Sequence, residues 1–282
     1  MSGLDAHLAG GASTVCRAWA VARRDGVVLG FTDHDRALRF EGVDFLPGAG
    51  FSARALVSAS GLSVDNSEVL GALSHEAIRE EEIEAGRFDE AELRLWLVNW
   101  ADVAERRLRF RGTLGEIRRE GGAFQAELRG LTERLNQRRG RSFQRSCSAV
   151  LGDASCRFDL QAPGFSVEVT LDAGGDGQAF SLPGLEDYAE GWFVHGRLVV
   201  LSGAGEGLVG LIKRDRQADG RRELLLWEPL RAPVVAGDRI HLLAGCDRRA
   251  ATCRGKFDNL LNFQGFPNLP GEDWLMAGPA RG

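Results

Sequence analysis

Gly245-Cys-Asp-Arg-Arg-Ala-Ala-Thr-Cys-Arg-Gly-Lys-Phe-Asp-Asn-Leu-Leu-Asn-Phe-Gln-Gly-Phe-Pro267 contains two of the chain's five cysteines, Cys246 and Cys253. A second pair, Cys147 and Cys156, lies far upstream. Four thiolates brought together from two distant segments form a plausible cage for zinc or for an iron–sulfur cluster. Such a cage would hold the C-terminal half of the chain together, so these four cysteines are the candidate ligands.

The spacing within each pair bears on what the cage would hold. Eight residues separate Cys147 from Cys156 and six separate Cys246 from Cys253, whereas each half of a zinc finger has about two to four between its ligands. Longer gaps suit a bulkier four-iron cluster, but spacing alone leaves zinc, a cluster and four unconnected thiols open. The fifth cysteine, Cys16, lies in an alternating run where we expect a buried structural thiol.

The overall composition is that of a soluble globular protein. Hydrophobic residues make up 44% and charged residues 27% of the chain, which argues against disorder and against a membrane protein. The net charge of -5 gives no electrostatic reason to expect a general nucleic-acid binder. We find no secretory pattern at the N-terminus and no run of roughly 20 apolar residues that would span a bilayer. We therefore expect folding in a reducing cytoplasm, where disulfides are rare.

Short strand-like stretches dominate the N-terminal half. Alternation predicts strands at Val15–Ala22, Val27–Phe31, Ala37–Phe40, Val43–Leu46, Ala91–Val98, Arg107–Ile117 and Phe124–Leu128. Asp25-Gly26 and Glu41-Gly42 indicate hairpin turns between the first four strands. The last three strands would form a meander with one buried face.

Few helices are expected, and all of them are short. Ser74 is a candidate N-cap for a helix that ends near Ala85, before Gly86, with Glu80, Glu81 and Glu82 on its solvent side. A second helix is predicted at Leu131–Gln137. The arginine-rich stretch 138–145 follows it and indicates a boundary, so we predict a β-rich domain at 1–140 and a second domain at 141–282.

The second domain also has a strand pattern. Strands are predicted at Phe165–Leu171, Gly191–Leu201, Gly207–Arg214, Arg222–Trp227 and Asp238–Ala244. Five strands without helices between them suggest a small antiparallel barrel or a strongly curved sheet. The loop Asp172–Gly177 lacks most ligands of a calcium loop, so a plain turn is expected there. The predicted fold class is therefore mainly β: an N-terminal β domain and a small C-terminal β-barrel-like domain with a four-cysteine metal cluster.

The cysteine segments carry a family resemblance. Together with Cys147 and Leu151-Gly-Asp-Ala-Ser-Cys156, the segment Gly245–Pro267 resembles the DUF2163 family of phage tail proteins. It is similar to the hub proteins of alphaproteobacterial gene transfer agents, and the C-terminal half is similar to lambda-type minor tail protein L. Thr32-Asp-His-Asp-Arg36 and Leu70-Gly-Ala-Leu73 resemble the N-terminal signature of that family, so the resemblance covers nearly the whole chain.

The resemblance implies a structural, non-enzymatic hub in the virion tail tip or baseplate, assembled in the cytoplasm of a bacterial host. Such hubs lie between the distal tail protein ring and a large, megatron-like tip or fibre protein. They are homotrimers around a channel through which DNA passes without specific binding. Relatives carry a [4Fe–4S] cluster on four cysteines, which match Cys147, Cys156, Cys246 and Cys253 here, and its role would be to stitch the domain together.

An enzyme is the alternative interpretation, for instance a tail-associated hydrolase or an electron carrier with an iron–sulfur or zinc centre. Asp33-His34-Asp35 is the only compact acid/base cluster, but adjacent strand residues point to opposite faces, so a hydrogen-bonded turn is the favoured interpretation. Four cysteine ligands would leave no open coordination position for a hydrolase, which favours the hub.

The tail motif has a structural interpretation as well. Its apolar side chains would form a cap on the second domain that shields the metal site. They are Phe257, Leu260, Leu261, Phe263 and Phe266. Asn259 and Asn262 would bond backbone groups in the turn between them.

Overall fold

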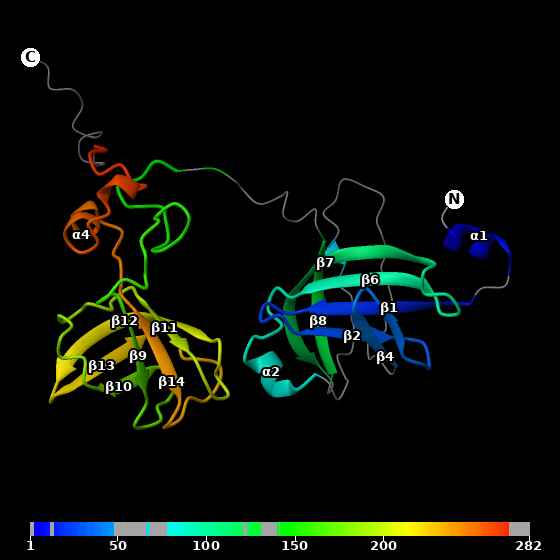
Figure 1. The fold of residues 1–282 in the computed structure, drawn as a ribbon, viewed down its shortest axis with the longest axis horizontal. Helices are drawn as coiled ribbons and strands as arrows, with labels where there is room; N and C mark the ends of the chain where they lie inside the picture. Colours follow the sequence, from blue (N-terminus) through cyan, green and yellow to red (C-terminus); the bar gives the residue numbers. More distant parts are fainter. Residues whose placement is uncertain are drawn as a thin grey trace, which may run out of the picture. The chain divides into compact units, whose positions relative to one another are not determined.

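The computed structural model describes residues 3–11, 14–47, 66–67, 78–120, 123–130, 140 and 142–270. The chain divides into two compact units, Met1–Arg139 and Gly140–Gly282 (Figure 1). Both are built mainly from β-strands, and the helices in the described ranges are few and short. The predicted mainly-β class is confirmed. In the described part of the chain, no helix has the length and apolar character needed to cross a membrane.

The first unit contains one eight-stranded sheet in the order β3-β4-β2-β1-β6-β7-β8-β5. Its strands are β1 (Val15–Ala22), β2 (Val28–Thr32), β3 (Leu38–Phe40), β4 (Val43–Pro47), β5 (Asn66–Ser67), β6 (Glu92–Asn99), β7 (Arg106–Glu120) and β8 (Ala123–Gly130). The hairpins β1–β2 and β3–β4 and the meander β6–β7–β8 are confirmed. Glu41 and Gly42 both have positive φ, as a two-residue hairpin turn requires.

Both faces of β1 and β6 are buried, so the single buried face expected of the meander β6–β7–β8 is wrong for β6. Trp19 of β1 and Leu95 of β6 belong to one core cluster. Ala18 of β1 and Trp96 of β6 belong to another cluster, with residues of β3 and β4. The hairpin of β3 and β4 therefore covers the second face of β1 and β6. A β-bulge between Leu95 and Trp96 allows these two adjacent residues of β6 both to be buried.

Two helices are described in the first unit, α1 (Gly3–Ala9) and α2 (Glu80–Glu84). The sequence did not predict α1. Helix α2 ends before Gly86 as predicted but begins at Glu80, and the proposed cap Ser74 lies outside the described residues. Also outside them lie Leu70–Leu73, the predicted helix Leu131–Gln137 and most of the arginine-rich stretch at 138–141. Glu82 is not on a solvent face, because it pairs with the buried Arg23.

The second unit contains an antiparallel sheet in the order β10-β13-β12-β11-β14-β9. Its strands are β9 (Ser166–Thr170), β10 (Ala179–Pro183), β11 (Arg197–Val200), β12 (Val209–Ala218), β13 (Arg221–Leu226) and β14 (Arg239–Leu243). The edge strands β9 and β10 are far apart in this order, yet both pack on one core, through Val169 and Phe180 among others. The sheet therefore curls around its core as a half-barrel.

Sequence analysis missed β10, because Ala179–Pro183 is short and follows the glycine-rich loop at 172–177. That loop is a turn, as predicted: Asp176 accepts hydrogen bonds from the backbone amides of Gln178 and Ala179, and Asp172 pairs with Arg221. The remaining elements of this unit, helix α4 (Ala250–Gly255) and the 3-10 helix η1 (Leu260–Asn262), lie with the loops of residues 142–165 to one side of the sheet (Figure 1).

Candidate metal centre

The four cysteines that the sequence singled out line one small cavity in the second unit. Cys147 and Cys156 belong to the loops that precede β9, Cys246 follows β14, and Cys253 lies in α4. Cys147, Cys156 and Cys253 are buried and Cys246 is partly buried, and all four are free thiols. Folding therefore brings side chains from two distant parts of the sequence to the same place.

Three of the four sulfur atoms accept a hydrogen bond. The backbone amide of Gln264 donates to Sγ of Cys147 over 3.3 Å, and the amide of Arg248 donates to Sγ of Cys246 over 3.4 Å. The side-chain amide of Asn259 donates to Sγ of Cys156 over 3.5 Å. Donors aimed at sulfur stabilise negative charge on it, so this environment suits thiolates.

Asn259 ties the two cysteine segments together. Its Nδ2 donates to the carbonyl oxygen of Cys156 over 2.7 Å, its backbone amide donates to the carbonyl of Cys253, and its own carbonyl accepts the thiol of Cys253. Asn262 donates in turn to Oδ1 of Asn259. The predicted hydrogen-bonding role of the two asparagines in this turn is confirmed for Asn259.

Two glycines allow backbones to cross closely beside the cysteines. A Cβ on Gly245 would lie 1.7 Å from the carbonyl oxygen of Val194, and a Cβ on Gly265 would lie 2.7 Å from the carbonyl oxygen of Arg145. Gly245 immediately precedes Cys246, and Arg145 is two residues before Cys147. These contacts explain why glycine is required at both positions.

The thiols affect one another electrostatically. Burial, with smaller contributions from the charges of Cys246, Cys147 and Cys156, raises the pKa of Cys253 to about 11. Burial also raises the pKa of Cys246, with Asp247, Cys147 and Cys156 adding to the effect. Both shifts favour the neutral thiols of Cys246 and Cys253, and a bound metal centre would reverse that preference.

Aromatic side chains connect the cysteine loops to the sheet. Phe257 contacts the rings of Phe158 and Phe165, with centroids 4.9 and 5.6 Å apart, and Phe165 contacts Trp192. Phe263 packs against the cluster that contains Cys147 and Cys156. The predicted apolar packing is confirmed for Phe257 and Phe263. It is wrong for Leu261, which is fully exposed because η1 turns its side chain outward.

The cavity is too small to hold a cluster without adjustment. Its volume is about 20 Å³, room for about one water molecule. Among the described residues, no three His, Cys, Asp or Glu side chains are grouped as one metal ion would require. The four cysteines therefore have the chemistry of a metal site. Their sulfur atoms, however, are not grouped closely enough to coordinate one metal ion tetrahedrally.

The other candidate residues lie in the first unit. Cys16 is 7% exposed and packs in a hydrophobic cluster, as predicted for a structural thiol. Asp33-His34-Asp35 forms a turn in which Asp33 accepts the amide of Arg17, and Nδ1 of His34 accepts the amide of Arg36. The ring of His34 lies against Trp100, with centroids 5.0 Å apart. The segment bends as the turn interpretation expected, but Asp33 bonds the distant Arg17 and not its own turn. Nδ1 of His34 also lies 3.2 Å from Oδ1 of Asp35, the kind of contact that the acid/base interpretation requires.

Comparison with known proteins identifies the family. A family model described as baseplate hub protein, N-terminal attachment domain, matches residues 1–159, more than half of the chain. The chain belongs to the baseplate hub protein family. The resemblance to phage tail hubs noted in the sequence is thereby confirmed. A second family model, described as phage conserved hypothetical protein BR0599, matches residues 191–273 of this hub family member.

A solved structure resembles this hub family member over nearly its whole length. It is a chain in the virion of a native gene transfer agent particle, with a TM-score of 0.91 and 54% sequence identity. The match covers 99% of this chain and 96% of that chain. Among curated proteins, no match is found.

Proposed function

We propose that the chain is a structural hub in the baseplate of a gene transfer agent or similar phage-like particle. The observation that carries this proposal is the 54% identity, over 99% of the chain, to a chain of a gene transfer agent virion. In this role the protein links the distal tail ring to a large tip protein, as a homotrimer around the channel through which DNA leaves. It works in the virion tail tip after assembly in the bacterial cytoplasm.

The two units suggest a division of labour. The family model that covers residues 1–159 describes an attachment domain, so we assign attachment to the first unit. The second unit then faces the tip protein. The net charge of -5 favours a channel wall that lets DNA pass without binding it.

Particle composition tests this role. Gene transfer agent particles from a strain that lacks the gene should carry no tip protein, and the full chain supplied from a plasmid should restore it. Cryo-electron microscopy of the restored particles should show three copies at the tail tip. Normal particles without the chain would overturn the hub role, and six copies would overturn the homotrimer.

We further propose that Cys147, Cys156, Cys246 and Cys253 hold a [4Fe–4S] cluster that stabilises the second unit. The support is the convergence of four sulfur atoms on one cavity, three of them with N–H donors. A zinc ion, the alternative, needs each sulfur at about 2.3 Å, and the donors are not grouped for one ion. A cluster would serve as a covalent cross-link between distant loops, and the loops would move apart slightly to admit it.

Elemental analysis of protein purified without oxygen tests the cofactor. Iron and acid-labile sulfide in equal amounts, with visible absorption, are expected. One zinc without sulfide would overturn the cluster and retain the cage, whereas protein without metal would overturn both. An iron–sulfur or zinc enzyme stays the alternative function, but a site filled by four cysteines leaves no position for substrate.

A further inference from the structure

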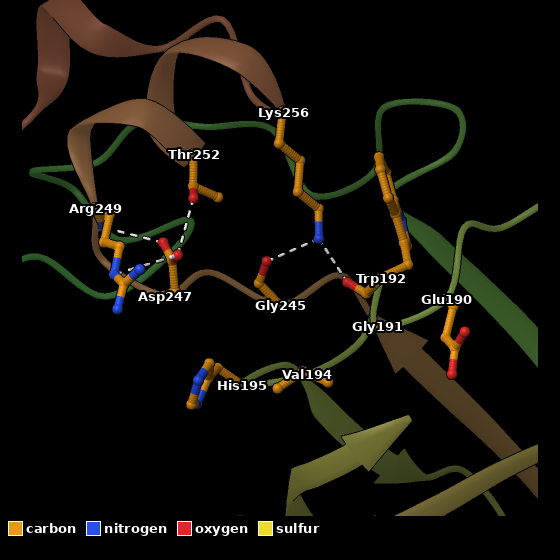
Figure 2. Close-up of a pocket in the computed structure, with 10 residues that line it drawn as sticks. All are labelled: Glu190, Gly191, Trp192, Val194, His195, Gly245, Asp247, Arg249, Thr252 and Lys256. Atoms are coloured by element: carbon orange, nitrogen blue, oxygen red, sulfur yellow. Dashed lines mark hydrogen bonds and ion pairs between the residues drawn. The ribbon is translucent and has the colours of Figure 1, made fainter. Parts of the chain in front are cut away.

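A pocket of about 450 Å³ lies in the second unit beside the cysteine loops. One wall is the turn that contains Trp192 and His195, and the other is the segment from Gly245 to Lys256 (Figure 2). Lys256 reaches into the pocket from the end of α4 and its ammonium group lies between the two walls (Figure 2). No cysteine lines this pocket, although Cys246 and Cys253 belong to the segment that forms its second wall.

The ammonium group of Lys256 has only neutral partners. It donates to the carbonyl oxygens of Trp192 and Gly245, over 2.5 and 2.9 Å, and it lies 4.1 Å from the centroid of the Trp192 ring. An ammonium group has three N–H donors, so one has no hydrogen-bond acceptor in the part of the chain that the structure describes. Among the described residues, no carboxylate forms an ion pair with it. Burial lowers the pKa of Lys256 to about 8, so the group is still mainly charged at neutral pH.

The carboxylates that line the pocket are directed elsewhere. Asp247 accepts hydrogen bonds from the hydroxyl of Thr252 and from the backbone amide of Arg249. Glu190 points away from Lys256 in Figure 2. The side chain of Arg249 is 80% exposed at the rim, where its Nε lies 3.9 Å from Oδ2 of Asp247 in a loose, exposed ion pair. A half-buried cation whose described hydrogen-bond partners are both neutral therefore faces a pocket with an aromatic wall. Cys246, Asp215 and Asp247 favour its charge without forming an ion pair with it.

We propose that this pocket binds a carboxylate side chain from an acidic segment of a neighbouring virion protein. The carboxylate would take the remaining donor of Lys256. Arg249 would exchange its loose pair with Asp247 for a second acidic residue of the same segment. A charge-assisted hydrogen bond in a partly desolvated site gives both affinity and orientation. This inference rests on the proposed baseplate role in one respect: that role makes a neighbouring virion protein the source of the carboxylate.

The two lysines of the chain make a direct test possible. Lys256 and Lys213 are the only lysines, and each lies over a tryptophan ring, Lys213 over Trp227 at 5.0 Å. Lys213 is on the exposed face of β12 and does not line this pocket. Nuclear magnetic resonance of the full chain with 13C-labelled lysine therefore gives one reporter and one internal control.

The probe is the blocked peptide acetyl-Glu-Gly-Glu-Gly-amide, and its control is the glutamine analogue. We expect the Lys256 signal to shift in a saturable way with the acidic peptide, while the Lys213 signal stays in place. Calorimetric titration with the same peptide, which needs no lysine signal, should show binding weakened roughly tenfold in Lys256→Gln, as expected for a lost charge-assisted hydrogen bond, and unchanged in Lys213→Gln. An unmoved Lys256 signal in the wild-type chain, or equal shifts at both lysines, would overturn the proposal.

Sodium acetate separates the two sources of a carboxylate. If acetate saturates the Lys256 shift at the same concentration as the peptide, the pocket is a small-anion site and the protein partner is overturned. Binding of the peptide does not depend on particle assembly. A failed peptide titration would therefore leave the hub role intact, and a failed hub role would leave the peptide result intact.

Discussion

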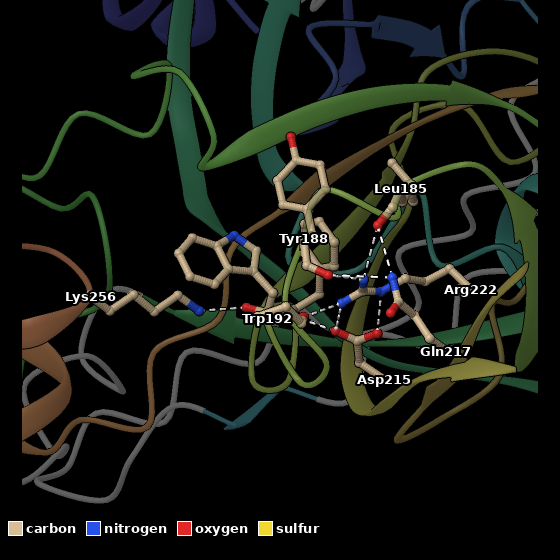
Figure 3. Close-up of polar contacts among 9 residues, drawn as sticks. Leu185, Tyr188, Trp192, Asp215, Gln217, Arg222 and Lys256 are labelled. Atoms are coloured by element: carbon tan, nitrogen blue, oxygen red, sulfur yellow. Dashed lines mark hydrogen bonds and ion pairs between the residues drawn. The ribbon is translucent and has the colours of Figure 1, made fainter. Parts of the chain in front are cut away.

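Arg222 and Asp215 form a two-point ion pair in which both side chains are completely buried (Figure 3). Nε of Arg222 donates to Oδ1 of Asp215 over 2.5 Å, and Nη2 donates to Oδ2 over 2.8 Å. The other three donors reach the carbonyl oxygens of Leu185, Tyr188 and Ala189. All five donors of the guanidinium are thus used, so the pair fastens the 185–189 loop to β12 and β13.

Loss of the arginine from this pair should destabilise the second unit strongly. Arg222→Met leaves the carboxylate of Asp215 buried without its counter-charge, and breaking such a pair costs about 3–5 kcal/mol. Chemical denaturation of the full chain, followed by a signal of the second unit, measures the change.

The neighbouring arginine is the matched control for that variant. Arg221 makes a two-point pair with Asp172 and two hydrogen bonds to Ser181, all at the surface. Because solvent screens these interactions and hydrates the partners that are left, Arg221→Met should cost clearly less stability than Arg222→Met. Equal effects of the two variants would contradict the assignment of the buried pair as the stabilising one.

Replacement of a cage cysteine should affect metal content and stability together. If the proposed cluster is bound, Cys147→Ser or Cys253→Ser should bind no iron and should lower the Tm of the second unit by at least about 5 °C, as expected for a loss of about 2 kcal/mol. Cys16→Ala is the control, because Cys16 lies in the first unit and should leave the iron content unchanged. Full iron content in both cage variants would exclude a shared site.

Replacement of Gly245 by alanine should disturb the close backbone packing next to Cys246. Gly245→Ala places Cβ against the carbonyl oxygen of Val194, and such overpacking costs about 1–3 kcal/mol. Gly255→Ala is the control, since its Cβ would meet nothing within 4 Å. That variant should be neutral or slightly stabilising by about 0.5–1 kcal/mol. Thermal melting compares the two, and a neutral Gly245→Ala would refute the close crossing.

The first unit should lose stability in mild acid through two carboxylates beside Arg23. Partial burial raises the pKa of Asp25 and Glu82, but hydrogen bonds and charge from Arg23 outweigh it, so both pKa values lie below the ordinary 3.8 and 4.5. The stabilisation is therefore complete above these ordinary values and is lost as the pH falls through the lower folded values.

Denaturation between neutral pH and about pH 3 tests this dependence. Glu82→Gln should reduce the loss of unfolding free energy that the first unit shows as the pH falls. Glu92→Gln, at the exposed pair with Arg111, should leave that loss unchanged. If Glu82→Gln loses as much stability in acid as the wild-type chain, other groups cause the pH dependence.

Local sequence pattern was sufficient for most of the strands. Val15–Ala22 is β1 residue for residue, and Asp25-Gly26 and Glu41-Gly42 are the turns that join the first hairpins. Alternation and turn chemistry are properties of neighbouring residues, so they can be identified without the fold. The cysteine motif was likewise sufficient to indicate the family and the four candidate ligands, because it is a pattern of residue types and spacings.

Only the tertiary structure decided which polar groups are buried and which apolar groups are not. Nothing in Arg221-Arg222 distinguishes the exposed arginine from the buried one, and nothing in Leu260-Leu261 shows that Leu261 faces solvent. The position of the Lys256 ammonium depends on carbonyl groups at Trp192 and Gly245 that are distant in sequence from one another. Burial and hydrogen-bond partners are set by contacts between distant segments, and the order of residues along the chain does not specify those contacts locally.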